Sequence, residues 1–294
     1  MTPLDYDFLR GFLKTRSGLV LSNDKQYLIE SRLMPIVRKN GMTSITELVQ
    51  KLKMPGQEPL ASAVTEAMTT NESFFFRDKT PFDHFKEHML PALMKARATK
   101  RHIRIWCAAA STGQEPYSLA MILKEMGAAV AGWRFEIIGT DLSGEVLERA
   151  KAGVYTQFEV QRGLPIQMLL KYFQQNGDQW TISQEIRSMV HYRTLNLLND
   201  FSALGQFDIV YCRNVLIYFD QPTKIDVLNR TARLLAPDGY LLLGAAETVV
   251  GLTEAFKPVT ERRGLYVPGG KPAVAAPGAA AAPKLFAYAG SRPS

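Results

Sequence analysis

The stretch from Ile103 to Met121 constrains the fold more than any other part of the chain. It reads IRIWCAAASTGQEPYSLAM, which is a short apolar run of β-forming residues, a turn of small residues, and then apolar residues at helical spacing. Pro116 suits the first turn of that helix, where no backbone donor is needed. A strand, a tight turn and a helix in this order form the unit that builds nucleotide-binding sites in doubly wound sheets.

The turn departs from the glycine-rich pattern of dinucleotide-binding proteins. It holds a single glycine, Gly113, and an acid, Glu115, stands at the start of the helix. A carboxylate at this place repels a pyrophosphate and attracts a cation. The pattern therefore disfavours a nicotinamide-dependent oxidoreductase and favours a ligand that carries positive charge.

A second acid follows the next predicted strand, which covers residues 135–139. Asp141 lies where doubly wound sheets place an acceptor for the hydroxyls of a ribose. The alternative for Asp141, or for Ser143, is to cap the helix predicted over residues 145–152. Together with Glu115, Asp141 strengthens the prediction of a ligand site at this edge of the sheet.

The alternation of strand and helix returns after residue 195. A buried strand is predicted at 207–212, and Arg213 and Asn214 follow at its carboxyl end, where ligands bind in open α/β sheets. The later predicted elements are a helix over residues 220–235, a fifth strand over 240–244 after the turn Pro237-Asp238-Gly239, and an antiparallel hairpin over 256–267. Five strands with helices between them predict a doubly wound α/β domain.

Residues 153–195 interrupt that alternation. Apolar residues alternate with charged ones as far as Val190 and Tyr192, which predicts short antiparallel strands. The sequence Asn176-Gly177-Asp178 predicts the turn of a hairpin among them. We therefore expect a small β-subdomain inserted over residues 153–195.

Residues 1 to about 70 lack β-forming runs and are predicted to form short helices. The second of these helices carries Arg32, Arg38 and Lys39. These three cations predict either an ordinary solvated helix face or a docking surface for an acidic partner. The residues alone favour neither interpretation.

Three consecutive phenylalanines, Phe74–Phe76, follow this helical region. They cannot all share one face of a helix, and we expect them to anchor the core at a domain junction. The polar residues Asn71, Ser73 and Arg77 surround them and could line a cleft between the domains.

The remaining chemically reactive side chains give weak signals. His84 and His88 have the spacing of a two-histidine metal site, but no third ligand is evident, so a solvated helix face and no metal are expected. Cys107 and Cys212 end apolar runs and are expected to be buried free thiols. No apolar run reaches the roughly 18 residues of a membrane span. We expect a cytoplasmic protein without membrane insertion.

The net charge of +7 is spread in a way that weakens a nucleic-acid interpretation. Three of the seven charges lie after Pro268, where the composition changes to Ala, Pro and Gly and predicts a disordered tail. The dense basic cluster at 95–104 is expected to be a solvated helix end, with a partner patch as the alternative.

Five spaced motifs give a specific resemblance to one family. They are TTNESFFFRD (69–78), AAASTGQEPYSLAM (108–121), GTDLS (139–143), LNLL (195–198) and CRNVLIYFD (212–220). From about residue 5 to 267 the chain resembles the chemotaxis receptor methyltransferases of the CheR type. The resemblance implies a class I S-adenosylmethionine-dependent methyltransferase fold, a doubly wound sheet ending in an antiparallel hairpin. It also implies a small all-α domain before the sheet and an antiparallel β-subdomain inserted in it.

The domain boundaries expected from this resemblance are 1–75 for the helical receptor-docking domain and 76–268 for the methyltransferase domain, with the insertion at 153–195 and the tail at 269–294. The resemblance further implies transfer of a methyl group from S-adenosyl-L-methionine to glutamate carboxylates of the cytoplasmic helical bundle of chemoreceptors. The products are glutamate methyl esters and S-adenosyl-L-homocysteine, and the role is chemotactic adaptation.

The family's functional residues carry over by motif. The implied cofactor contacts are Asn71, Ser73, Arg77, Glu115, Asp141, Asn196, Leu197, Arg213 and Asn214. Tyr218 matches a tyrosine that the family places at the reaction centre, where it orients the carboxylate, and Arg77 pairs with that carboxylate or with the cofactor. Ser73 replaces the family's usual threonine and keeps its hydroxyl, whereas Gln114 replaces an acid. A glutamate with a pKa near 4.3 is already ionised at neutral pH, so no general base is required.

The resemblance also bears on partners. The loop at 174–180 is shorter than in members that bind a receptor's C-terminal pentapeptide, so we expect pentapeptide-independent action by a monomer. Docking through Arg32, Arg38 and Lys39 is the expected route to the receptor.

Two further alternatives belong to other function classes. A nucleic-acid methyltransferase would show an (N/D)PP(Y/F) box or a catalytic cysteine, and this chain has Arg213-Asn214-Val215-Leu216 after the fourth strand, so no nucleic-acid partner is expected. A domain that only senses the cofactor is disfavoured because Glu115, Asp141, Arg77 and Tyr218 are intact.

Overall fold

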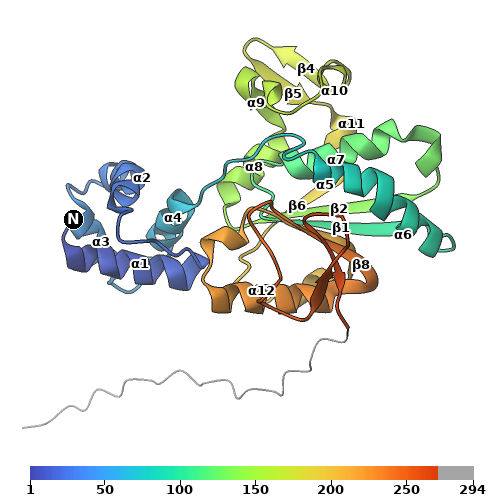
Figure 1. The fold of residues 1–294 in the computed structure, drawn as a ribbon. Helices are drawn as coiled ribbons and strands as arrows, with labels where there is room; N and C mark the ends of the chain where they lie inside the picture. The colour runs from blue at the N-terminus through green and yellow to red at the C-terminus, as the bar shows by residue number, and fades with distance from the viewer. Residues whose placement is uncertain (271–294) are drawn as a thin grey trace, which may run out of the picture.

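The computed structural model describes residues 1–270, so nearly all of the expected tail at 269–294 lies outside the described residues. Within residues 1–70 the chain forms a helical domain, seen in blue in Figure 1. Its helices are α1 (Pro3–Ser17), α2 (Gln26–Lys39), α3 (Ile45–Leu52) and α4 (Glu58–Met68). Their apolar faces meet in one core around Leu9, Leu33 and Val64, all fully buried. The all-α expectation for this region is confirmed.

A seven-stranded sheet forms the centre of the larger domain, in the order β6-β2-β1-β7-β8-β10-β9. The strands are β1 (His102–Ala108), β2 (Arg134–Asp141), β6 (Val190–Thr194), β7 (Phe207–Cys212), β8 (Leu235–Leu243), β9 (Phe256–Pro258) and β10 (Leu265–Pro268). The first five strands in this order are parallel, and β10 and β9 close the edge as an antiparallel hairpin. The predicted class I methyltransferase layout is confirmed.

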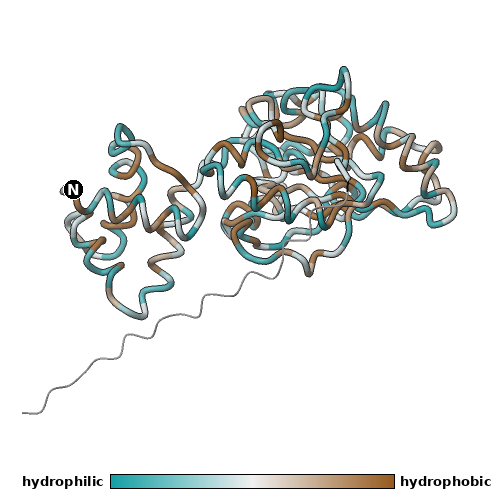
Figure 2. Tube along the Cα trace, turned by 60° about the horizontal axis from the view of Figure 1, so that its bottom comes forward, coloured by the Kyte–Doolittle hydropathy of each residue, from teal (hydrophilic) through white to brown (hydrophobic). Residues whose placement is uncertain are grey.

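Helices cover both faces of this sheet, and Figure 2 shows that hydrophobic stretches run through the middle of the larger domain. Ile105 and Cys107 of β1 join the core on one face, whereas Trp106 and Ala108 join the core on the other. Burial on both sides explains why β1 reads as a continuous apolar run. The helices are α5 (Thr80–His84), η1 (Phe85–Met89), α6 (Leu90–Ala96), α7 (Gln114–Glu125), η2 (Gly127–Val130), α8 (Gly144–Ala152), η3 (Ser202–Leu204), η4 (Leu216–Tyr218) and α12 (Gln221–Leu234).

A small antiparallel sheet interrupts the larger domain, in the order β3-β5-β4. Its elements are β3 (Val154–Thr156), α9 (Gln157–Gln161), α10 (Ile166–Tyr172), β4 (Phe173–Asn176), β5 (Gln179–Ile182) and α11 (Gln184–Arg187). The predicted hairpin at 176–178 joins β4 to β5. The prediction for Val190 and Tyr192 was wrong, because both lie in β6 and pair in parallel with β2 of the main sheet. Tyr192 packs over the bare backbone of Gly139, a contact that alternation along the sequence cannot reveal.

Three further expectations need correction. Pro237-Asp238-Gly239 is no turn before a strand but lies within β8, whose pairing with β7 shifts register there. His84 is not solvated, because it is buried beside Arg262. In the basic cluster at 95–104, Arg97 is bound to Asp208 and Asp238 and Arg104 to Glu136, so these two arginines hold the sheet together.

Two other expectations are confirmed. Cys107 and Cys212 are buried and free. Phe75 is the core anchor among the three phenylalanines, with its ring against Tyr155 and Phe173 of the small subdomain. Its neighbours Phe74 and Phe76 are half-buried.

The helical domain meets the larger domain at Gly18, the C-cap of α1. Its φ of +77° is left-handed, and a Cβ there would lie 2.8 Å from the ring of Phe219. Gly41 has a similar φ of +68° but open space around it.

We predict that Gly41→Ala lowers the free energy of unfolding by about 1–2 kcal/mol, from the left-handed backbone alone. Gly18→Ala should cost about 1–3 kcal/mol more, from overpacking against Phe219. Equal losses of unfolding free energy in urea would contradict the proposed contact.

Candidate functional site

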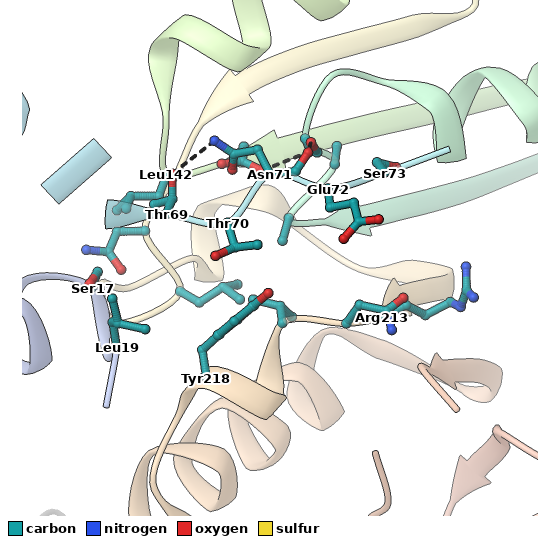
Figure 3. A pocket seen from close by; sticks show the side chains of 18 of the residues that line it. Ser17, Leu19, Thr69, Thr70, Asn71, Glu72, Ser73, Leu142, Arg213 and Tyr218 are labelled. Atoms are coloured by element: carbon teal, nitrogen blue, oxygen red, sulfur yellow. Dashed lines mark hydrogen bonds between the residues drawn. The ribbon is translucent and has the colours of Figure 1, made fainter. Parts of the chain in front are cut away.

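A pocket opens at the carboxyl ends of β1, β2 and β7, where the helical domain meets the sheet (Figure 3). In Figure 3 the linker residues Thr69–Ser73 form one wall, Tyr218 points toward them from the opposite wall, and Ser17 and Leu19 lie at one end. All ten residues predicted for cofactor and reaction line this pocket: Asn71, Ser73, Arg77, Glu115, Asp141, Asn196, Leu197, Arg213, Asn214 and Tyr218. The structure thus brings together residues spread over nearly 150 positions of the sequence, roughly half of the chain.

The turn after β1 shapes one side of the pocket. Ala109, Ser111 and Gly113 all have positive φ, at 59°, 51° and 92°. Of these three positions, 113 is the one that requires a glycine. A Cβ at Gly113 would lie 2.5 Å from the hydroxyl oxygen of Tyr192. The single glycine of the turn is therefore explained by close packing against β6. No pyrophosphate has to be invoked.

Asp141 joins this turn to the one after β2. Its carboxylate accepts the N–H groups of Ser111 at 2.9 Å and Ser143 at 3.0 Å. Burial raises the pKa of Asp141, and the two N–H donors act to lower it. Of the two residues considered as the cap of the following helix, Ser143 is the one that takes this role. Its side chain accepts a hydrogen bond from the N–H of Val146 at the start of α8.

Glu115 does not face the pocket as a lone carboxylate. The guanidinium of Arg213 donates to it at 2.6 Å and to Asp78 at 2.6 Å, and the Arg213 side chain is only 2% exposed. Burial raises the pKa of Glu115, while the neighbouring Arg213 lowers it. For Arg213 itself burial lowers the pKa, but Glu115 and Asp78 outweigh this and leave it raised. The sequence predicts that the negative charge of Glu115 binds a cationic ligand. In the structure, this carboxylate already pairs with Arg213 of the protein itself.

The helical domain contributes to the pocket in a way that sequence reasoning missed. The Asn196 side chain donates to the carbonyl of Arg16 at 2.5 Å, and the N–H of Val20 donates to the carbonyl of Tyr218 at 2.9 Å. Lys14 pairs with Asp220 at 2.8 Å. These contacts carry no local signature, because each joins segments roughly 180 to 206 residues apart.

Arg32 holds the linker that forms the pocket wall. Its guanidinium donates to the carbonyls of Met68 at 2.8 Å and Thr69 at 3.0 Å, and to the hydroxyl of Thr70 at 3.1 Å. The other two cations of the predicted docking face, Arg38 and Lys39, are exposed. One predicted docking residue is therefore engaged within the protein, and two are free to meet a partner.

Sequence reasoning also missed Glu247, in the segment between β8 and β9. Its carboxylate accepts N–H groups of the segment that follows β7, including that of Asn214 at 2.8 Å. Glu247 lies 33 residues from Asn214 in the chain and belongs to none of the five motifs, so no pattern indicated it.

Comparison with known proteins agrees with this geometry. Residues 71–265 match the family model described as CheR methyltransferase, SAM binding domain, and residues 4–69 match the CheR methyltransferase, all-alpha domain. The chain belongs to the CheR methyltransferase family. It is therefore a methyltransferase that uses S-adenosyl-L-methionine.

Relatives in several bacteria cover most of the chain. The chemotaxis protein methyltransferase 1 of Pseudomonas aeruginosa is 44% identical over 261 residues, which are 87% of this chain and 94% of that protein. The chemotaxis protein methyltransferase of Vibrio anguillarum is 43% identical, over 86% of this chain and 92% of that protein. The protein of that name from Escherichia coli is 35% identical, over 82% and 83% of the two chains.

The residues of the pocket fit this cofactor. Asp141 and Glu115 offer carboxylate oxygens to hydroxyl and ammonium groups, and Leu142, Leu197 and Val215 offer apolar contacts to a base. Among residues 1–270 there is no cluster of three or more His, Cys, Asp or Glu placed to hold a metal ion. In the same residues no helix is long and apolar enough to span a membrane.

The Arg32 contacts predict a defect in cofactor binding. Arg32→Ala releases the carbonyls of Met68 and Thr69. Hydrogen bonds to a charged group contribute about 1.5–3 kcal/mol, and we expect only part of this loss to reach the pocket, giving about 3- to 10-fold weaker binding of S-adenosyl-L-homocysteine. Arg38→Ala, on the exposed part of the same helix, is the matched control and should bind as the wild type does. Calorimetric titration of both variants measures this. Equal affinities in the two would show that Arg32 does not shape the pocket.

Proposed function

We propose that this protein methylates glutamate side chains of chemoreceptor cytoplasmic domains, giving methyl esters and S-adenosyl-L-homocysteine in chemotactic adaptation. The observation that carries the proposal is the convergence of all ten motif-matched residues on one pocket. The names of the relatives, chemotaxis protein methyltransferases, support the same substrate. The cytoplasm, where the receptor domains lie, is the proposed location.

Binding and orientation are the tasks that the proposal gives to the pocket residues. When bound, S-adenosyl-L-methionine supplies a methyl group on a positively charged sulfur, and the carbon–sulfur bond breaks as an oxygen of the glutamate takes the methyl group. We assign Asp141 to the ribose hydroxyls and Glu115 to the amino group. The remaining matched cofactor contacts are Asn71, Ser73, Asn196, Leu197, Arg213 and Asn214.

Tyr218 and Arg77 are the residues proposed to meet the incoming carboxylate. Tyr218 is half-buried, and its ring points across the pocket (Figure 3). The Arg77 guanidinium donates to the carbonyl of Glu72 at 2.9 Å and lies over the ring of Phe74, which leaves further donors for a carboxylate. Since glutamate is ionised at neutral pH, orientation in a pocket that excludes water is the main demand on the protein.

Domain roles follow from the same proposal. We assign residues 1–75 to receptor docking and 76–268 to methyl transfer, and we place the end of the inserted subdomain before β6, near residue 188. The exposed Arg38 and Lys39 are the proposed docking cations, with Arg32 supporting the pocket. The hairpin joining β4 to β5 is short, which supports pentapeptide-independent action. We propose that the protein acts as a monomer.

The direct test is methyl transfer to receptors. The protein should transfer label from tritiated S-adenosyl-L-methionine to cytoplasmic receptor fragments, and base should release the label as methanol. Fragments with and without their last five residues should be methylated at rates within about 3-fold of each other if the tail peptide is not a tether, since peptide tethering otherwise raises the effective concentration by far more. Absence of base-labile label with every receptor of the host would overturn the proposal.

The raised pKa of Glu115 predicts a pH dependence of cofactor binding. A cationic amino group prefers the ionised carboxylate, so affinity for S-adenosyl-L-homocysteine should fall as pH drops through the pKa of Glu115. Because burial raises this pKa, the fall should begin at a higher pH than for an exposed glutamate. Titration calorimetry between neutral and mildly acidic pH measures it. Glu115→Gln should bind more weakly with a flatter profile, and a profile as steep as that of the wild type would remove Glu115 from the role.

A further inference from the structure

The carboxylate of Glu247 accepts hydrogen bonds from four main-chain N–H groups. One oxygen accepts from Asn214 at 2.8 Å and Gly244 at 2.7 Å. The other accepts from Val215 at 2.9 Å and Ile217 at 3.3 Å. Three of these donors belong to the short segment between β7 and Tyr218. A single side chain therefore binds three of the five N–H groups of residues 213–217, the segment that leads to Tyr218.

This segment needs such an acceptor because it leaves the sheet abruptly. β7 ends at Cys212, and Asn214 has a φ of +60°, in the left-handed region that asparagine adopts more readily than most residues other than glycine. N–H groups at such a bend lack the partners that a strand or helix would give them. An ionised acceptor makes stronger bonds to them than a neutral one. After the bend, the main-chain N–H of Tyr218 donates to the carbonyl of Val215 at 3.2 Å, within the turn η4.

Gly244 gives an independent sign that this contact is closely fitted. A Cβ at Gly244 would lie 2.7 Å from the side-chain nitrogen of Asn214 and 2.8 Å from a carboxylate oxygen of Glu247. The end of β8 and the start of the Asn214 segment thus meet with no room for a methyl group. Glu247 in turn donates its own N–H to the carbonyl of Gly244 at 3.0 Å. The acceptor and the segment it binds are held in one rigid contact.

We propose that Glu247 is a positioning residue for methyl transfer. Its carboxylate fixes residues 214–217, and through them it sets the direction in which Tyr218 points across the pocket. The inference rests on the proposed role of Tyr218 in orienting the carboxylate of the substrate. Glu247 itself is not among the residues that line the pocket and acts only through the main chain.

Glu247→Gln tests the proposal with little change in size. The amide keeps one acceptor oxygen but turns its NH2 group toward main-chain donors, so about half of the contact is lost. We expect the turnover number at saturating substrates to fall roughly 10- to 100-fold, as for other small displacements of reacting groups. Hydrogen exchange of the peptide that contains residues 214–218 should accelerate. The control is Glu254→Gln, in the same connecting segment, where the side chain is exposed.

A double-mutant cycle separates positioning from a general loss of structure. In a Tyr218→Phe background, Glu247→Gln should reduce turnover by less than about 3-fold, because coupled residues are not additive. Gly244→Ala disturbs the same contact from the other side and should reproduce the defect if Glu247→Gln does not fold. Equal losses in both backgrounds, or unchanged exchange at 214–218, would overturn the inference. A wild-type enzyme that binds cofactor but methylates no receptor would overturn the proposed function, and the exchange result would still decide the role of Glu247 in holding the segment.

Discussion

The buried guanidinium of Arg213 connects the segments from which the pocket is built. It follows β7, and it pairs with Glu115 at the start of α7 and with Asp78 in the segment that leads out of the helical domain. Removal of Arg213 would leave the carboxylate of Glu115 without its partner, and breaking a buried pair in this way costs about 3–5 kcal/mol. Asp78 also has a φ of +67°, so the junction is held in a conformation that it would not adopt freely. The geometry of the pocket therefore depends on a buried cation of the protein itself, which is in place before any ligand binds.

This arrangement changes the meaning of the acid in the first turn. From the sequence, Glu115 is a carboxylate that awaits a cation. In the structure it already has one, and its pKa reflects the balance between burial and Arg213. A glutamate held in this way keeps its orientation without a ligand, which lowers the entropy lost on binding. Arg213 thus orients the acid, and the acid remains available at the wall of the pocket.

The residues that line the pocket could be predicted from the sequence, whereas most of the residues that hold them in place could not. The motifs supplied residues that directly line the pocket, because those residues follow strands whose apolar pattern is clear, as at 207–212. The role of Glu247 and the contact between Val20 and Tyr218 could not be predicted. Both involve main-chain groups, and every residue type other than proline carries the same ones. Val190 and Tyr192 were placed in the wrong sheet, since a two-residue period does not say which strand a neighbour will be. Arg32 was interpreted as a surface cation. Its acceptors are main-chain carbonyls at the end of α4, which no residue pattern indicates.

The position of the helical domain is a condition for the pocket as well as for docking. Four contacts tie this domain to the sheet: Lys14 with Asp220, Arg16 with Asn196, Val20 with Tyr218, and Glu66 with Ser143. Spatial continuity alone does not demonstrate energetic coupling. Here, however, two of the four contacts are made by pocket residues themselves, Asn196 and Tyr218. A displacement of the helical domain must break those bonds, so a partner that moves this domain also moves the wall that faces the substrate.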